Sequence, residues 1–255
     1  MEYMSGGSLR ILLFDDDVVL HMNLRLRMSS EIANGISFLH NFNEKHRLVH
    51  GDLKPDNILL TMDLHCKIAD FGGAKMVKYS MSTPTHTEAT QGQMTEAYAA
   101  PERLSRTSVP AKEQDTYSFG LIIHGILSRH SPIEGFLSEN AYLQAIKQGG
   151  HPSMVIIDTL KRDSKEGALI ITVCLESVMT RCWKQDPASR PAMLSIRGEL
   201  SELLRIQPVN ELSRSVAEAQ SSLQPFRPCE CSDDCLPLHC FNTSSGTFNQ
   251  RMIFV

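Results

Sequence analysis

The sequence predicts a mainly α-helical fold with a small β-hairpin region. Several long segments repeat apolar residues every three or four positions, which is the period of an amphipathic helix. One segment, residues 47–69, instead has short apolar runs separated by Pro, Asp and Asn, which is typical of short strands and turns. With 42% hydrophobic and 21% charged residues, the 255-residue chain has enough apolar material for a core.

The helices follow in order along the chain. The first is expected from about Leu24, on the spacing of Met28, Ile32, Ile36 and Leu39. The segment 117–127 is apolar nearly all round, which predicts a helix in the middle of the core. Two further amphipathic helices are expected over 171–182 and 193–204. The intervening segments predicted as loops or connections are residues 1–10, 78–97 and 158–167.

The strands are expected at residues 48–50, 58–60 and 66–69, with a hairpin turn near Met62 and Asp63. Past Ile206 the helical pattern fades. We therefore expect one domain over residues 1–206 and a disordered, Cys- and Ser-rich tail over 207–255. A zinc site in that tail stays open as an alternative, although its cysteine spacing is not a standard one. The tail cysteines are Cys229, Cys231, Cys235 and Cys240.

Composition narrows the function. The net charge of −4 and the pI of about 6.2 argue against a nucleic-acid binder. No apolar stretch is long enough to span a membrane, and the N-terminus lacks the features of a signal peptide. Three cysteines lie in apolar patterned segments and are expected to be buried and reduced, which favours a cytoplasmic protein. They are Cys66, Cys174 and Cys182.

The chemistry is concentrated around the expected hairpin. Asn57 and Asp70 fall at ends of its strands, where their oxygens could converge on Mg²⁺. Asp52 would lie nearby as a proton acceptor, and Lys54 could neutralise a phosphoryl group in transfer. The alternative is a plain β-hairpin whose Asp and Asn residues only form turns.

A set of motifs in this order resembles the eukaryotic protein kinase family. The motifs are His-Gly-Asp-Leu-Lys-Pro-Asp-Asn at 50–57, Asp-Phe-Gly at 70–72, Ala-Pro-Glu at 100–102, Asp-Thr-Tyr-Ser-Phe-Gly at 115–120 and Cys-Trp-Lys-Gln-Asp-Pro-Ala-Ser-Arg-Pro at 182–191. The resemblance covers residues 1–206, from the hinge to the end of the C-terminal lobe. Lys54-Pro55 resembles the Ser/Thr type, and the 182–191 signature resembles the tyrosine-kinase-like group near the receptor-interacting kinases.

The resemblance implies roles for individual residues. Asp52 would be the catalytic base and Lys54 would contact the γ-phosphate of ATP. Asn57 would hold the second Mg²⁺, and Asp70 the Mg²⁺ that bridges the phosphates. Structural roles are also implied: His50 and Phe71 in a stacked spine, Asp115 as anchor of the catalytic loop, and Glu102 with Arg190 as a buried ion pair.

The start of the chain resembles a kinase hinge. The carbonyl of Glu2 and the backbone of Met4 would bond the adenine of ATP, and Leu59 would lie beneath the ring. The resemblance thus implies ATP and Mg²⁺ as cofactors and phosphorylation of Ser or Thr on protein substrates in intracellular signalling.

Two departures from the family pattern stand out. Gly51 replaces the Arg of His-Arg-Asp, and the sequence contains neither a G-x-G-x-x-G loop nor a Lys before Lys45. We therefore expect the N-terminal lobe to be absent, through a fragmentary gene model, a truncated splice form or a pseudokinase-like module. The chain alone is expected to be a weak or inactive enzyme. The alternative function is a catalytically silent module that binds other kinases or adaptors.

Overall fold

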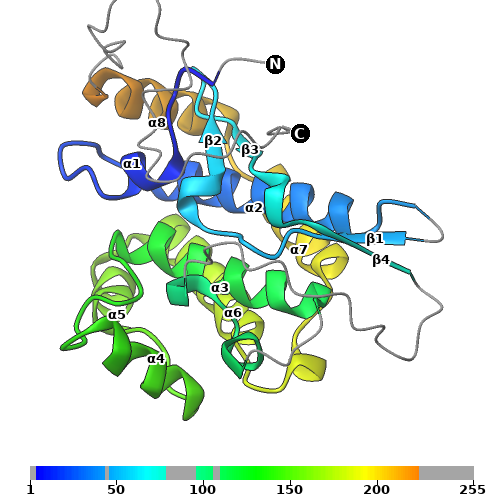
Figure 1. Cartoon of the computed structure of the whole chain (residues 1–255). Coiled ribbons are helices and arrows are strands. Elements are labelled where there is room, and N and C mark those ends of the chain that lie inside the picture. The colour runs from blue at the N-terminus through cyan, green and yellow to red at the C-terminus, as the bar shows by residue number, and fades with distance from the viewer. Residues whose placement is uncertain (1–3, 44–45, 79–95, 106–109, 224–255) are drawn as a thin grey trace, which may run out of the picture.

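The computed structural model describes residues 4–43, 46–78, 96–105 and 110–223. Two small antiparallel sheets of two strands each lie against a group of helices (Figure 1). The mainly helical fold with a β-hairpin region is therefore confirmed. In the described part of the chain, none of the helices has the length and apolar character needed to cross a membrane.

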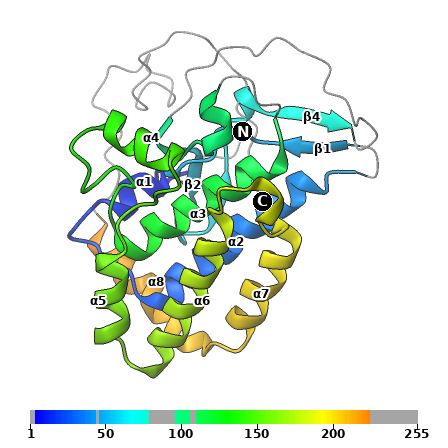
Figure 2. The same ribbon diagram turned by 90° about the horizontal axis from the view of Figure 1, so that it is seen from below.

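Four long helices form the centre of the molecule. They are α2 (Met22–His40), α3 (Lys112–Ser128), α6 (Glu166–Cys182) and α7 (Met193–Arg205). Every residue of α3 from Gln114 to Ser128 is buried, as its apolar composition on all sides predicts. Figure 2 shows α3 and α6 side by side, with α5 and α7 at their flanks.

The backbones of α3 and α6 approach closely at Gly120. A Cβ atom built on Gly120 would lie 2.9 Å from the Cβ of Cys182 and 3.2 Å from the carbonyl oxygen of Met179. A larger residue would therefore force the two helices apart. The buried thiols of Cys182 and of Cys66 are both free, as predicted, and Cys174 is half-buried.

The functional hairpin consists of β2 (Ile58–Leu60) and β3 (Cys66–Ile68), in antiparallel register with Ile58 opposite Ile68. The N-terminal segment adds to its free edge, because Gly6 N–H donates to the Leu60 carbonyl at 3.0 Å and Leu60 N–H donates to the Gly7 carbonyl at 2.9 Å. A separate ribbon pairs β1 (His46–Val49) with β4 (Lys75–Lys78).

Three short helices occupy segments in which the sequence indicated loops or gave no signal. The short helix α1 (Leu9–Leu13) begins inside the expected loop 1–10 and ends beyond it. Its residues Leu9, Leu12 and Leu13 are buried. The helix α4 covers Glu139–Lys147. The helix α5 (Val155–Asp163) runs into the expected connection 158–167, and the prediction of a plain connection is wrong there.

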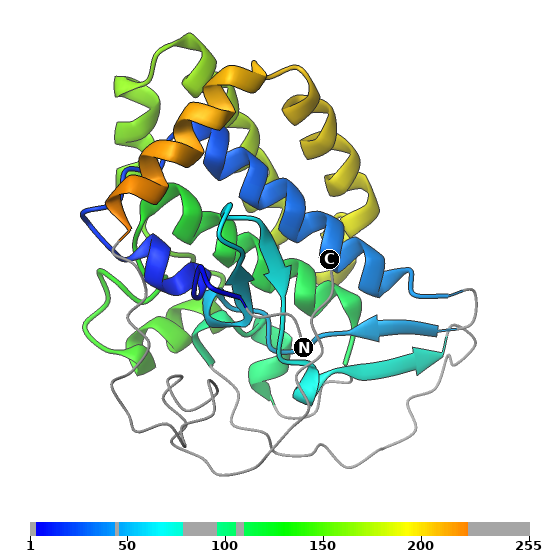
Figure 3. The ribbon, with the colours of Figure 1, turned by 90° about the horizontal axis from the view of Figure 1, so that it is seen from above.

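A further helix, α8 (Val209–Ser222), lies where the sequence indicated a disordered tail. It packs across α2, with Ala219 fully buried and Ser215 nearly so (Figure 3). The prediction of a disordered segment from residue 207 onward is therefore wrong for this helix. The tail cysteines lie outside the described residues.

Candidate active site

The hairpin brings Asn57 and Asp70 to one end of the β2–β3 pair. Asn57 directly precedes β2, and Asp70 follows β3 by two residues. The ladder continues past both strands, since Ala69 N–H donates to the Asn57 carbonyl at 2.8 Å. The hydrogen-bond pattern of this short hairpin thus places the backbones of Asn57 and Asp70 at the same end of the strand pair; convergence of their side chains on one Mg²⁺ stays a prediction.

Asn57 also holds the loop that carries Asp52. Its Nδ2 donates to the backbone carbonyl of Asp52 at 2.8 Å and to the Asp52 carboxylate at 3.2 Å. Because both contacts use the amide nitrogen, the Asn57 Oδ1 is left as the atom that can accept a further ligand. Asn57 is buried, so this orientation is fixed by its surroundings.

Lys54 lies beside the same carboxylate. Its Nζ is 3.0 Å from Asp52 Oδ2, and the two side chains are 16% and 23% exposed. This is a partly shielded ion pair that keeps one face open to solvent. Asp52, Lys54 and Asn57 therefore form one connected group.

His50 joins the Asp52 loop to the segment that precedes Asp70. Asp52 N–H donates to His50 Nδ1 at 3.3 Å, and His50 Nε2 lies 3.0 Å from the Ala69 carbonyl. This network assigns the neutral imidazole with its proton on Nε2, because Nδ1 acts as the acceptor. The His50 ring also packs against Phe71, with ring centroids 5.0 Å apart, in agreement with the stacking that the family resemblance implied.

Asp115, at the start of α3, anchors the loop backbone from below. It accepts hydrogen bonds from His50 N–H at 2.9 Å, from Gly51 N–H at 2.8 Å and from the His40 ring at 2.9 Å. Burial alone would raise the pKa of Asp115, but the bonds and positive charge from His40, with the His50 and Gly51 contacts, hold it below its ordinary value. The predicted anchoring role agrees with this geometry.

The predicted ion pair is also formed. Arg190 and Glu102 meet through two hydrogen bonds of 2.7 and 2.9 Å, which link the segment before α7 to the Ala-Pro-Glu turn. The Arg190 side chain is fully buried and that of Glu102 is 26% exposed.

The residues predicted to contact adenine come from the N-terminal segment and from β2. Glu2 lies outside the described residues. Met4 is buried, and Leu59 lies half-buried in β2, opposite Lys67. The bridge between Ser8 and Leu59 shows that the N-terminal segment pairs with β2. Adenine binding there stays a prediction.

Asn57 and Asp70 have the chemistry that Mg²⁺ requires. Asp70 adopts a left-handed backbone conformation (φ 65°), and in the described part of the chain its carboxylate has no hydrogen-bond or ion-pair partner. Mg²⁺ is usually held by one or two carboxylates together with substrate phosphates. The described residues contain no group of three or more His, Cys, Asp or Glu suited to a metal, so a cage made of protein ligands alone is not part of this region.

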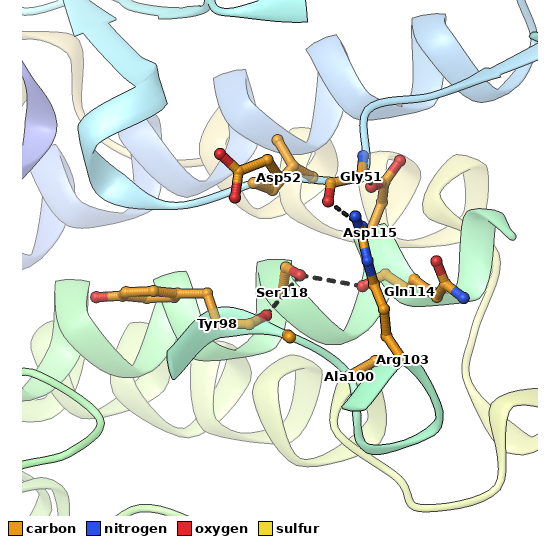
Figure 4. A pocket seen from close by; sticks show the side chains of 10 residues that line it. Gly51, Asp52, Tyr98, Ala100, Arg103, Gln114, Asp115 and Ser118 are labelled. Carbon is orange, nitrogen blue, oxygen red and sulfur yellow. Dashed lines mark hydrogen bonds between the residues drawn. The ribbon is translucent and has the colours of Figure 1, made fainter. Parts of the chain in front are cut away.

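Sequence reasoning missed Arg103. It lines a small pocket between the loop and the Ala-Pro-Glu turn, together with Gly51, Asp52, Tyr98 and other residues (Figure 4). Its guanidinium donates through Nη1 to the Gly51 carbonyl. The sequence did hold a signal for such a residue. Gly51 replaces the Arg of the kinase His-Arg-Asp motif, so a basic side chain from elsewhere could take that place.

Comparison with known proteins agrees with this geometry. The family model "Protein kinase domain" matches residues 1–199. The chain is 35% identical over 214 residues to bovine receptor-interacting serine/threonine-protein kinase 2, an alignment that covers 80% of this chain and 37% of that protein. It is 30% identical over 260 residues to human ankyrin repeat and protein kinase domain-containing protein 1, covering 99% and 32%. The chain thus spans about a third of the length of these relatives.

Proposed function

We propose that this chain, which belongs to the protein kinase family and is similar to the receptor-interacting kinases, carries the machinery for phosphoryl transfer from MgATP to Ser or Thr hydroxyls of proteins. The observation that carries the proposal is the joining of Asp52, Lys54 and Asn57 into one connected group, at the end of the hairpin from which Asp70 follows. The names of several relatives include "serine/threonine-protein kinase", which supports the acceptor type.

The residues divide the work of the reaction. The Asp52 carboxylate orients the acceptor hydroxyl and takes its proton. Lys54, 3.0 Å from that carboxylate, lies close enough to offset the negative charge of a phosphoryl group in transfer. Asn57 Oδ1 and the Asp70 carboxylate would hold Mg²⁺. When bound, MgATP supplies the phosphoryl group and the metal charge that phosphoryl transfer needs.

The proposal includes the architecture of a kinase C-terminal lobe with its hinge over residues 1–206, acting in the cytoplasm on protein substrates. In the family, a glycine-rich loop covers the phosphates and a strand Lys contacts them. This sequence contains no G-x-G-x-x-G and no Lys before Lys45. Half of the nucleotide site would then be open to water, so we expect the chain alone to transfer phosphoryl groups weakly or not at all.

The lack of a G-x-G-x-x-G motif and of a Lys before Lys45 also favours a second candidate function. A chain that holds only part of a nucleotide site could serve as a catalytically silent module that binds other kinases or adaptors through the surface of the lobe.

Two measurements separate these functions. The first is titration of the purified chain with MgATP, and the second is transfer of labelled γ-phosphate to a generic protein substrate. Asp52→Asn should abolish the transfer, whereas Asp63→Asn, at an exposed position in the hairpin turn, should leave it unchanged.

Transfer that survives Asp52→Asn would refute the assignment of Asp52. No transfer by the unmodified chain, together with capture of a kinase or adaptor, would favour the silent module. Turnover equal to that of a two-lobe kinase would refute the expected weak activity.

A further inference from the structure

Arg103 connects the Ala-Pro-Glu turn to the loop that carries Asp52. It stands on the short helix η4 (Pro101–Ser105), and its guanidinium reaches across the pocket to the Gly51 carbonyl (Figure 4). Burial lowers the pKa of Arg103, while the nearby carboxylates of Asp52 and Asp115 act in the opposite direction. Arg103 is therefore a partly buried cation directed at a backbone oxygen.

That oxygen belongs to the peptide unit directly before Asp52. Because a peptide unit is planar, the Gly51 carbonyl and the Asp52 N–H turn together as one body. Arg103 binds the oxygen end, and His50 Nδ1 accepts the hydrogen bond from the N–H end at 3.3 Å. Contacts at both ends restrict rotation of the plane and so restrict the direction in which the Asp52 side chain leaves the backbone.

The turn that carries Arg103 is itself fixed. The neighbouring Glu102 is held by Arg190 through two hydrogen bonds. Two backbone carbonyls just upstream are also held: that of Tyr98 accepts from Ser118 Oγ at 2.8 Å, and that of Ala97 accepts from the Tyr142 hydroxyl at 2.9 Å. Because the Ala-Pro-Glu turn is held in place, the Arg103 side chain can fix the position of the loop that carries Asp52.

Gly51 and Arg103 depend on each other. Gly51 has φ +75°, a conformation that favours glycine, and a Cβ atom there would lie 3.0 Å from Arg103 Nη1. A side chain at position 51 would have to use the space that the guanidinium fills. Because Gly51 has no side chain, the guanidinium of Arg103, 52 positions further along the chain, can lie against the loop.

We infer that Arg103 is a positioning residue for Asp52, which locks the Gly51–Asp52 peptide unit and couples the Ala-Pro-Glu turn to the proposed catalytic base. The importance of this coupling for turnover rests on the proposed function, whereas the locking itself does not. Any movement of residues 101–103 away from the loop would release the peptide unit.

The test measures hydrogen–deuterium exchange at the Asp52 amide in the full chain. Arg103→Ala should speed that exchange by about tenfold, because the peptide unit loses one of its two restraints. Exchange in α3 and α6 should stay unchanged. Guanidinium chloride at low millimolar concentration should restore slow exchange by refilling the space, whereas equal NaCl should not. Arg205→Ala, which removes an exposed guanidinium, is the matched control.

Unchanged exchange at Asp52 in Arg103→Ala would overturn the inference. Faster exchange throughout the molecule, or loss of folding, would also overturn it, because either result indicates a general structural role. Where the unmodified chain shows transfer, Arg103→Ala should lower kcat by about tenfold or more and leave the KM for ATP unchanged. The exchange measurement needs no turnover. An inactive chain that captures a kinase or adaptor would favour the silent module over phosphoryl transfer, and the role of Arg103 would still be decided by exchange.

Discussion

The guanidinium carbon of Arg190 lies over the ring of Tyr117, 5.0 Å from its centroid. The same side chain binds Glu102 and donates to the carbonyls of Lys184, Glu113 and Gln185. Arg190 therefore joins α3, the Ala-Pro-Glu turn and the segment before α7 at one buried point. A planar group with five N–H donors suits such a junction, and a Lys could not replace all of its contacts.

We expect Arg190→Met to lower the free energy of unfolding by about 3–5 kcal/mol, since the variant breaks a buried pair and leaves carbonyl groups without donors. Glu102→Gln should cost less, because the amide oxygen still accepts one of the two bonds. Urea denaturation measures both. Arg205→Met, which breaks an exposed pair with Glu202, should leave the free energy of unfolding nearly unchanged, because solvent screens that pair. Equal losses at positions 190 and 205 would contradict the central role of Arg190.

Two glycines in helices should respond to alanine in opposite ways. Gly120→Ala should destabilise the protein by about 1–3 kcal/mol, because the new methyl group would meet the Cys182 Cβ and backbone atoms of α6. Gly198 lies in α7 with no atom within 4 Å of its built Cβ, so Gly198→Ala should stabilise by up to about 1 kcal/mol through helix propensity. Thermal unfolding of the two variants side by side checks the contrast. A loss of stability at position 198 would argue against an open site there.

His124 should make stability depend on pH. Burial lowers the pKa of His124 below its ordinary value of 6.5, and its Nε2 lies 3.0 Å from the Ser153 carbonyl. Below pH 6.5 the unfolded chain therefore binds a proton that the folded chain resists. The free energy of unfolding should fall with decreasing pH, with a slope from this group of at most about 1.4 kcal/mol per pH unit.

Urea denaturation at a series of pH values on the acid side of 6.5 measures this slope. His124→Gln should flatten it, while His65→Gln, at an exposed position, should not remove the His124 contribution. The same slope in wild type and His124→Gln would show that other groups cause the dependence.

The helix α8 should contribute to stability although it lies beyond the expected domain end. Asn23 Nδ2 donates to Glu211 at 3.0 Å, Gln220 donates to the Met62 carbonyl at 2.7 Å, and Ala219 is fully buried. In a chain that ends at residue 206 the free energy of unfolding should fall by roughly 2 kcal/mol, which is about the contribution of burying one aliphatic side chain. A chain that ends at residue 223 keeps α8 and is the control. Equal stability of the two chains would show that α8 adds nothing.

The candidate site was the most predictable part of the molecule. Asn57 and Asp70 flank the strands of a short hairpin, whose ends can be located from local residue patterns, and Asn57 holds the loop that carries Asp52. Helix α3, which is buried from Gln114 to Ser128, was equally predictable, because the segment 117–127 is apolar nearly all round.

The errors have physical causes. In α5 the apolar residues lie early, at residues 155–157 and at Leu160, and only Ile157 is buried; the polar residues that follow indicated a connection instead of a helix. In α8 and its C-cap the apolar residues follow helical spacing, but the surrounding Ser, Asn and Pro residues obscure this pattern. The apolar residues are Val209, Leu212, Val216, Ala219 and Leu223. Arg103 was missed because its partner is a backbone oxygen far along the chain, a contact that residue type alone does not reveal.

Cys66 and Cys182 are enclosed in different halves of the molecule, one in strand β3 and one at the end of α6. Burial raises the pKa of both thiols, so neither one offers a thiolate to an alkylating reagent while its surroundings stay closed. Each sulfur can then be modified only as fast as its own region opens. The protein thus contains two natural reporters, and peptide-resolved labelling would tell whether the hairpin or the helical bundle gives way first.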